Sequence, residues 1–177
     1  LATQGEYVIG YSDFLPDGKF VFIGWQTEKY EYTNNASIFE VTPQGVRLIC
    51  YPDISLTNAV SSDVRYGENR VQRVHDDFLY TVTTEVTRSV IRRFSLDGQI
   101  TLLHAVDGSV DDFDIAGDEI LFIGQREMKL QELYALKNGR EQQVSRINEG
   151  LAPANTLGEL CHMEFQNGGF DVHYLVL

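Results

Sequence analysis

The chain has 177 residues, 43% hydrophobic and 23% charged, and its 26 acidic against 14 basic side chains leave a formal net charge of -12. This composition describes a folded protein of about one domain and excludes an intrinsically disordered chain. The pI near 4.6 argues against nucleic acid or an anionic membrane as a partner. The sequence contains no run of about 18 apolar residues, so it predicts no transmembrane helix. The cysteines Cys50 and Cys161 fit neither a disulfide-rich scaffold nor a CxxC metal or redox site.

The two ends of the chain suggest a piece of something longer. It begins at Leu1 and ends on the apolar run Tyr174–Leu177, where a natural terminus usually frays into solvent. We therefore expect a fragment. No signal peptide is visible, and we expect a cytoplasmic location.

Three segments share one design, in which an apolar strand, a polar loop and a second strand end at a glycine turn. The strand pairs lie over 17–24 and 37–45, 76–82 and 90–98, and 117–124 and 132–139. Shorter strands over 46–50, 99–104 and 142–147 complete the units. Units of about 40 residues with four short strands are typical of propeller blades. Dipeptides that favour tight hairpin turns are Asp17-Gly18, Asp97-Gly98, Asn138-Gly139 and Asn167-Gly168.

Two segments are compatible with more than one local structure. Tyr51–Asn69 carries Pro52 and several serines and aspartates, which indicates an inserted loop. Gln125–Leu136 has partial helical periodicity, but Leu133–Leu136 occupies the strand position of the repeat, so we predict a strand there.

The predicted fold is therefore all-β. We expect a β-propeller fragment of about three four-stranded antiparallel blades, approximately at 7–50, 70–104 and 110–148, in a single partial propeller domain over 1–177. A linker and C-terminal hairpin follow over 149–177. Three blades do not close a ring, since about four or more are needed, and the unpaired edges of an open array predict self-association.

The third unit and the C-terminal segment carry a resemblance to a known family. Phe113–Gly124, Glu132–Gly139 and Val144-Ser-Arg-Ile-Asn148 resemble a late blade of the acylaminoacyl-peptidase-like propellers of the prolyl oligopeptidase family, in which a short strand ends in Leu-Thr-x-x-Asn. The hairpin Glu164–Val176 is similar to the one that leads into the hydrolase domain of that family. The resemblance covers 17–177 and is best in the last part of the chain.

The resemblance implies a non-catalytic propeller that caps and gates an α/β-hydrolase domain, which would follow Leu177 and admit short peptides. The serine, aspartate and histidine of the family belong to that domain, so we expect no catalytic, cofactor-binding or metal-binding residue in this chain, and no cofactor. The closest string to a Gly-x-Ser-x-Gly elbow is Gly10-Tyr-Ser-Asp-Phe14, which lacks the second glycine. We assign it to the strand that enters the first blade.

The histidines are scattered. His75, with Asp76 and Asp77, is predicted to lie in a turn. His162 and His173 are expected in the last hairpin on opposite sides of the Asn167-Gly168 turn, near but not clearly opposite each other. No carboxylate or third histidine is evident at ligand spacing, which argues against a metal pair.

Each of the remaining charged and polar segments can have either a structural role or a functional one. The acidic run Asp107–Asp114 suggests either a solvated face or a calcium loop, although its spacing is not that of an EF-hand. For Arg88, Arg92 and Arg93 we expect ion pairs with carboxylates of a neighbouring blade.

The polar loop Gln26–Asn35, with Trp25, Tyr30 and Tyr32, is either a solvent-exposed hairpin or a contact surface for a partner domain or subunit. Asn35-Ala-Ser37 matches an N-glycosylation sequon, a pattern common by chance.

Two alternatives to the peptidase hypothesis stay open. A stand-alone propeller that binds proteins or small ligands would need further blades upstream and no hydrolase downstream. A propeller enzyme such as a lactonase or lyase would need several carboxylates or histidines that converge on a central channel. Only Asp107–Asp114 points to the latter, and a calcium titration discriminates it.

Overall fold

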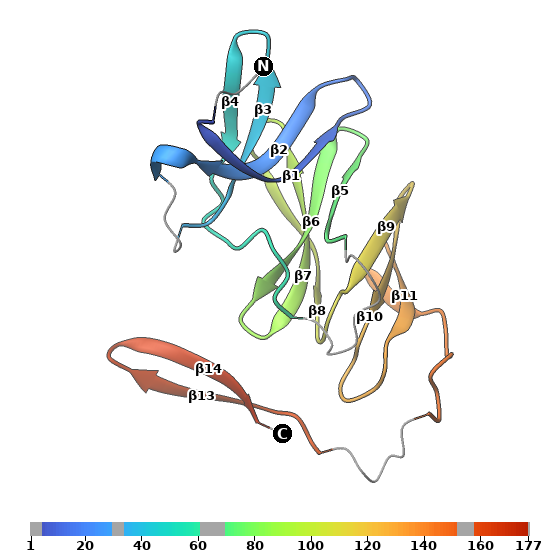
Figure 1. The fold of residues 1–177 in the computed structure, drawn as a ribbon. Coiled ribbons are helices and arrows are strands. Elements are labelled where there is room, and N and C mark those ends of the chain that lie inside the picture. The colour runs from blue at the N-terminus through green and yellow to red at the C-terminus, as the bar shows by residue number, and fades with distance from the viewer. Residues whose placement is uncertain (1–4, 30–33, 61–69, 152–157, 177) are drawn as a thin grey trace. The chain divides into compact units, whose positions relative to one another are not determined.

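The computed structural model describes residues 5–29, 34–60, 70–151 and 158–176, and in them it shows strands and one short 3-10 helix (Figure 1). The strands form three four-stranded sheets, with the orders β1-β2-β3-β4, β5-β6-β7-β8 and β12-β11-β10-β9, and one two-stranded sheet, β13-β14. The predicted all-β fold, with three four-stranded antiparallel sheets and a C-terminal hairpin, is confirmed. The described part of the chain holds no helix of the length and apolarity that a membrane span requires.

Backbone contacts divide the chain into two units. The first comprises Leu1–Thr57, Gln72–Thr83 and Ile91–Leu103, and the second comprises Asn58–Val71, Thr84–Val90 and His104–Leu177. The second sheet therefore contributes to both units.

The first sheet is built from aromatic and branched residues. Phe22 and Phe39 are register partners whose rings stack at 4.9 Å, and the ring of Tyr7 meets both edge-on. On the opposite face, Ile23 and Ile38 are buried in the core of the first unit. The strands are β1 (Tyr7–Phe14), β2 (Phe20–Gln26), β3 (Ser37–Thr42) and β4 (Gly45–Cys50), and the 3-10 helix η1 (Thr27–Lys29) follows β2. The string Gly10–Phe14 lies in β1, as predicted.

The second sheet completes the core of the first unit. Leu79 of β6 and Phe94 of β7 are buried against Ile23 and Ile38. The strands are β5 (Gln72–His75), β6 (Phe78–Glu85), β7 (Arg88–Ser95) and β8 (Ile100–Val106). The prediction that His75 lies in a turn is wrong, because it ends β5 and pairs with Phe78, which leaves only Asp76 and Asp77 for the turn.

The third sheet consists of β9 (Asp112–Ala116), β10 (Glu119–Gly124), β11 (Glu132–Lys137) and β12 (Arg140–Gln143). β11 confirms the choice of a strand over a helix. The strand predicted over 142–147 is misplaced. Asn138 and Gly139 both have positive φ, 51° and 71°, and reverse the chain within two residues, so that Arg140 already pairs with Lys137.

The glycines Gly24, near the end of β2, and Gly124, at the end of β10, have a steric cause. A Cβ atom on Gly24 would lie 2.2 Å from the carbonyl oxygen of Val8, and one on Gly124 would lie 2.1 Å from that of Ser109. No side chain fits where the neighbouring backbone approaches so closely.

The predicted inserted loop 51–69 is partly a structural element, although residues 61–69 lie outside the described part. The side chain of Leu56 is only 2% exposed and belongs to the core of the first unit. In the second unit, Asn58 Nδ2 donates to the carbonyl oxygens of Val60 and Val110, both at 2.8 Å, while its Oδ1 accepts from Ser89 Oγ at 3.1 Å. The buried start of this loop therefore contributes to packing.

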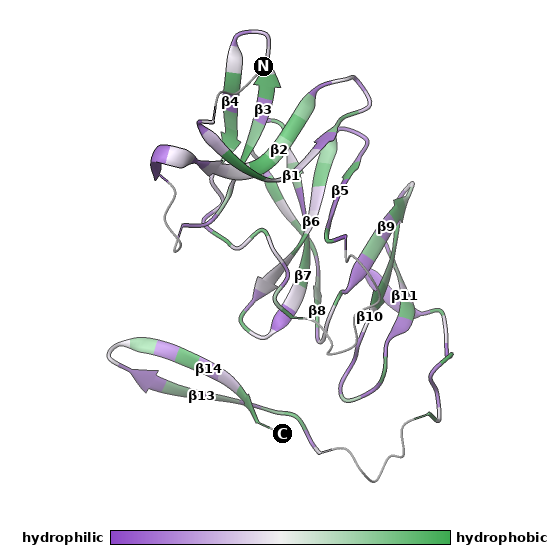
Figure 2. Cartoon of the chain, viewed as in Figure 1, coloured by the Kyte–Doolittle hydropathy of each residue, from purple (hydrophilic) through white to green (hydrophobic). Residues whose placement is uncertain are grey.

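The last hairpin consists of β13 (Cys161–Asn167) and β14 (Phe170–Val176), and nearly all of its residues are exposed. Its turn is formed by Gly168 and Gly169, both at positive φ, whereas Asn167 is the last residue of β13. The predicted Asn167-Gly168 turn is therefore displaced by one residue. The first four residues of β14, Phe170–His173, alternate between hydrophobic and hydrophilic, and Figure 2 colours the strand by hydropathy.

Candidate functional site

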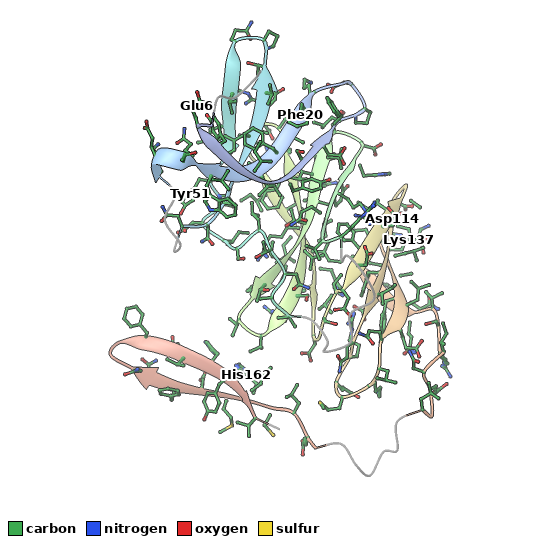
Figure 3. The ribbon with its side chains drawn as sticks, viewed as in Figure 1. Glu6, Phe20, Tyr51, Asp114, Lys137 and His162 are labelled. Atoms are coloured by element: carbon green, nitrogen blue, oxygen red, sulfur yellow. The ribbon has the colours of Figure 1, made fainter. Side chains whose placement is uncertain are left out.

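A cavity of about 460 Å³ lies beside the loop that the sequence singles out. It is lined by Glu6, Tyr7, Gln26, Glu28, Lys29 and Val46; Figure 3 labels Glu6. These side chains offer carboxylates, an amide and an ammonium group, which suit polar ligands but include no activated nucleophile.

The aromatic residues of that loop do not all face outward. Trp25 is half-buried against the core of the first unit, and its Nε1 donates to the carbonyl oxygen of Asn34 at 2.8 Å. The side chain of Trp25 therefore packs within the first unit. Tyr30 and Tyr32 lie outside the described residues. Asn35 of the sequon is half-buried, with its Nδ2 3.4 Å from Asp53 Oδ1.

Two carboxylates of the acidic run accept hydrogen bonds from the backbone beside them. Asp112 and Asp114 each accept from the amide of the next residue, at 2.8 and 2.9 Å. Asp111 is buried and its Oδ2 accepts from Gln131 Nε2 at 3.4 Å. Within the described ranges, no three His, Cys, Asp or Glu side chains gather closely enough to hold a metal ion.

The arginine cluster makes three different contacts. Arg88 pairs with Glu85 of its own sheet at 3.3 Å, Arg92 donates to Thr83, and the guanidinium of Arg93 lies 4.3 Å from the centre of the Phe78 ring. The contact of Arg88 is local rather than directed to a carboxylate of another blade, because the β6–β7 hairpin places Glu85 three residues away.

Arg126, Glu141 and His104 form a charged cluster in the second unit that the sequence analysis missed. Glu141 Oε2 lies 2.7 Å from His104 Nε2, and Glu141 Oε1 accepts from Arg126 Nε at 3.0 Å. The guanidinium also lies over the ring of Tyr134, 4.2 Å from its centre. Burial by itself raises the pKa of Glu141, but the hydrogen bond with His104 and the contacts with Arg126 outweigh it and lower the pKa to about 2.

A second buried carboxylate explains the short motif after β12. Glu132 accepts from the Ser145 hydroxyl and from the amides of Ile147 and Asn148, at 2.9 and 2.7 Å for the amides. Asn148 Nδ2 also donates to the carbonyl oxygen of Gln131. The hydrogen bond from Ser145 and those from the backbone lower the pKa of Glu132. The serine and asparagine of Val144–Asn148 thus fix the segment that leaves the third sheet.

The remaining titratable groups of interest are cysteines and histidines. Cys50 and Cys161 are both free, and burial raises the pKa of Cys50 to about 11, so its thiol is not ionised at neutral pH. His75 Nε2 lies 3.6 Å from Asp76 Oδ2. His162 and His173 are brought together on the hairpin, and Glu164 is the register partner of His173.

Comparisons with known proteins agree with this architecture. No protein-family model and no curated protein matches the sequence. Among solved structures, puromycin hydrolase and a mutant of it in complex with PGG each match 96% of this chain at 13% identity and a TM-score of 0.57. A puromycin-hydrolyzing peptidase of Mycobacterium tuberculosis matches 93% at 12% identity and a TM-score of 0.56.

This chain spans only 25% of the length of each of these three matched chains. At such low identity the likeness concerns the fold alone. The three four-stranded sheets and the terminal hairpin have the fold of a β-propeller fragment.

Proposed function

We propose that this chain is the non-catalytic propeller part of a serine peptidase that resembles acylaminoacyl peptidase, and that it caps and gates an α/β-hydrolase domain encoded after residue 177. The substrates of the whole protein would be short peptides. The likeness in fold to puromycin hydrolases, one of which is a puromycin-hydrolyzing peptidase, and the resemblance of the third blade support this proposal. The two free cysteines agree with a cytoplasmic location, where thiols stay reduced.

The observation that carries the proposal is the uncovered apolar face of the β13–β14 hairpin. Strand alternation places Met163, Phe165, Tyr174 and Val176 on one face, where they are 46%, 50%, 40% and 45% exposed. A two-stranded hairpin is only marginally stable by itself and needs a layer to pack against. In our proposal the hydrolase domain supplies that layer.

The test compares this chain with a polypeptide that continues beyond residue 177. We expect the extended protein to contain a Gly-x-Ser-x-Gly elbow, to hydrolyse short acylated peptide anilides and to be inactivated by a serine-directed phosphonate. The chain of 177 residues should show no hydrolysis. A continuation without such an elbow would falsify the proposal.

A pair of variants tests the role of the hairpin in the extended protein. Phe165→Asp should lower its melting temperature and activity, because it places a charge in the proposed interface, whereas Leu175→Asp, at an exposed residue opposite His162 on the other face, should change neither. In the chain of 177 residues both variants should melt like the unaltered protein. Equal tolerance of both variants in the extended protein would remove the hairpin from the interface.

We also propose that the isolated chain self-associates through the unpaired edges of its sheets, such as the edge strands β1 and β4 of the first sheet. Ile9, Phe14 and Leu48 are 45%, 62% and 53% exposed there. Because the net charge of -12 opposes association, the average mass in light scattering should rise with salt. Phe14→Glu should keep the chain monomeric, whereas Ile147→Glu, at a residue 80% exposed, should not. A monomer at high protein and salt concentration contradicts this proposal.

A further inference from the structure

The cavity beside η1 has the volume of a small-molecule site. At about 460 Å³ it lies within the range of about 300–1,000 Å³ that is usual for ligand pockets. Its described lining residues come from the segment that enters β1, where Figure 3 labels Glu6, and from the end of β2, η1 and the start of β4. All of them belong to the first unit, so this unit by itself builds the described lining.

Hydrogen bonds of Thr27 hold the acidic side of the cavity in shape. The amide of Thr27 donates to the carbonyl oxygen of Glu6 at 2.7 Å, and its hydroxyl donates to the carbonyl oxygen of Gly5, also at 2.7 Å. Because Glu28 directly follows Thr27, these bonds keep the backbone of Glu6 and that of Glu28 close together. Both residues are exposed and line the cavity, so their carboxylates are within reach of a bound molecule.

Tyr7 and Val46 form the apolar part of the lining. The ring of Tyr7 meets the buried rings of Phe22 and Phe39 edge-on, with the ring centres 5.5 and 5.2 Å apart. These contacts restrain the Tyr7 ring, so a molecule that packs against it loses little entropy in ordering it. The cavity therefore combines an apolar wall with a charged side.

The charged residues of the cavity select a cation. The carboxylates of Glu6 and Glu28 against the single ammonium group of Lys29 leave the described lining with a formal charge of -1. The net charge of -12 on the whole chain adds a field that attracts cations and repels anions. No group of three His, Cys, Asp or Glu side chains is gathered in the described ranges, so an organic cation suits this lining better than a metal ion.

We propose that this cavity binds a small primary amine with an apolar body. The ammonium group of the ligand donates hydrogen bonds to the carboxylates of Glu6 and Glu28, and such charge-assisted bonds are stronger than neutral ones. The apolar body packs against Tyr7 and Val46 and leaves water. Lys29 repels the ammonium group and thereby disfavours ligands with more than one region of positive charge.

Titration of the 177-residue chain with phenethylamine, followed by the amide resonances of Tyr7 and Val46, tests the site. We expect saturable shifts at neutral pH, where the amine is charged, and an affinity that falls with added salt. Glu28→Gln should weaken binding about threefold, and Lys29→Gln should strengthen it to a similar extent because it removes a like charge. Glu127→Gln is the matched control, since this side chain is 75% exposed and lies in the second unit, and it should leave the affinity unchanged.

Two further probes separate the two parts of the proposed recognition without any variant. 2-Phenylethanol has the same body without the charge and should bind about threefold more weakly. Methylamine has the charge without the body and should bind about tenfold more weakly. Equal affinity for either probe and phenethylamine would refute the proposal, as would the absence of saturable shifts or an unchanged affinity in the Glu28 variant. Melting curves check that the variants are folded. The site does not depend on the peptidase function, because the test uses only this chain.

Discussion

Glu141→Gln should lower the free energy of unfolding by about 2 kcal/mol, because the variant leaves the charge of Arg126 largely buried without its carboxylate. The side chains of Glu141 and Arg126 are only 21% and 15% exposed, so solvent compensates little of the loss. Urea unfolding at neutral pH, with the midpoint and slope fitted together, measures the difference.

The pH dependence of this difference is a second signature. The pKa of Glu141 falls from an ordinary 4.5 to about 2 on folding, so the carboxylate stabilises the fold above the ordinary value and loses this effect as the pH falls through about 2. The unaltered chain and the variant should therefore converge in stability as the pH decreases toward 2. Glu119→Gln in the same sheet is the control, since its exposed contact with Lys137, at 3.7 Å, is worth under about 1 kcal/mol. An equal loss in both variants would contradict the assigned role of Glu141.

Leu56→Ala should destabilise the first unit by about 3 kcal/mol, through lost transfer energy and the cavity left behind. Leu56 is 2% exposed and lies in the core with Ile23, Ile38, Leu79 and Phe94. Chemical denaturation followed by the fluorescence of Trp25, which packs against the same core, reports on the unfolding of this unit.

Leu102→Ala provides the comparison for this prediction. Leu102 lies in β8 and is 53% exposed, so its truncation should cost under about 1 kcal/mol. A Leu56 variant that unfolds at the same urea concentration as the Leu102 variant would show that the start of the 51–69 segment does not stabilise the unit.

Local patterns in the sequence predict the sheets well because each strand and its turn are encoded within a few residues. The Asn138-Gly139 turn and the apolar strands around Phe22 and Phe122 illustrate this. Contacts between distant segments leave no such local signal. Leu56 follows a proline in a polar stretch, and nothing nearby indicates that it is buried.

The charged sites show the same limit. His104 and Glu141 are 37 residues apart, and only the arrangement of the sheets brings them together. On the last hairpin, a turn placed at Asn167-Gly168 shifts the count between the strands, so that Glu164 no longer faces His173. The true turn at Gly168 and Gly169 restores that pairing, which the sequence analysis therefore missed.

The hydrogen bonds that Glu132 accepts from the 145–148 segment also determine the length of the free linker between the third sheet and the hairpin. Because Asn148 is held at the third sheet, only the linker up to Cys161 separates that sheet from the hairpin. Such a linker spans at most about 45 Å, at about 3.5 Å per residue when fully extended. The linker therefore keeps the hairpin at an effective concentration in the millimolar range relative to the third sheet. Even a weak contact between the hairpin and the propeller would then be populated. Removing the Glu132 carboxylate would release the 145–148 segment from the third sheet. The free linker would then be longer and the effective concentration of the hairpin lower.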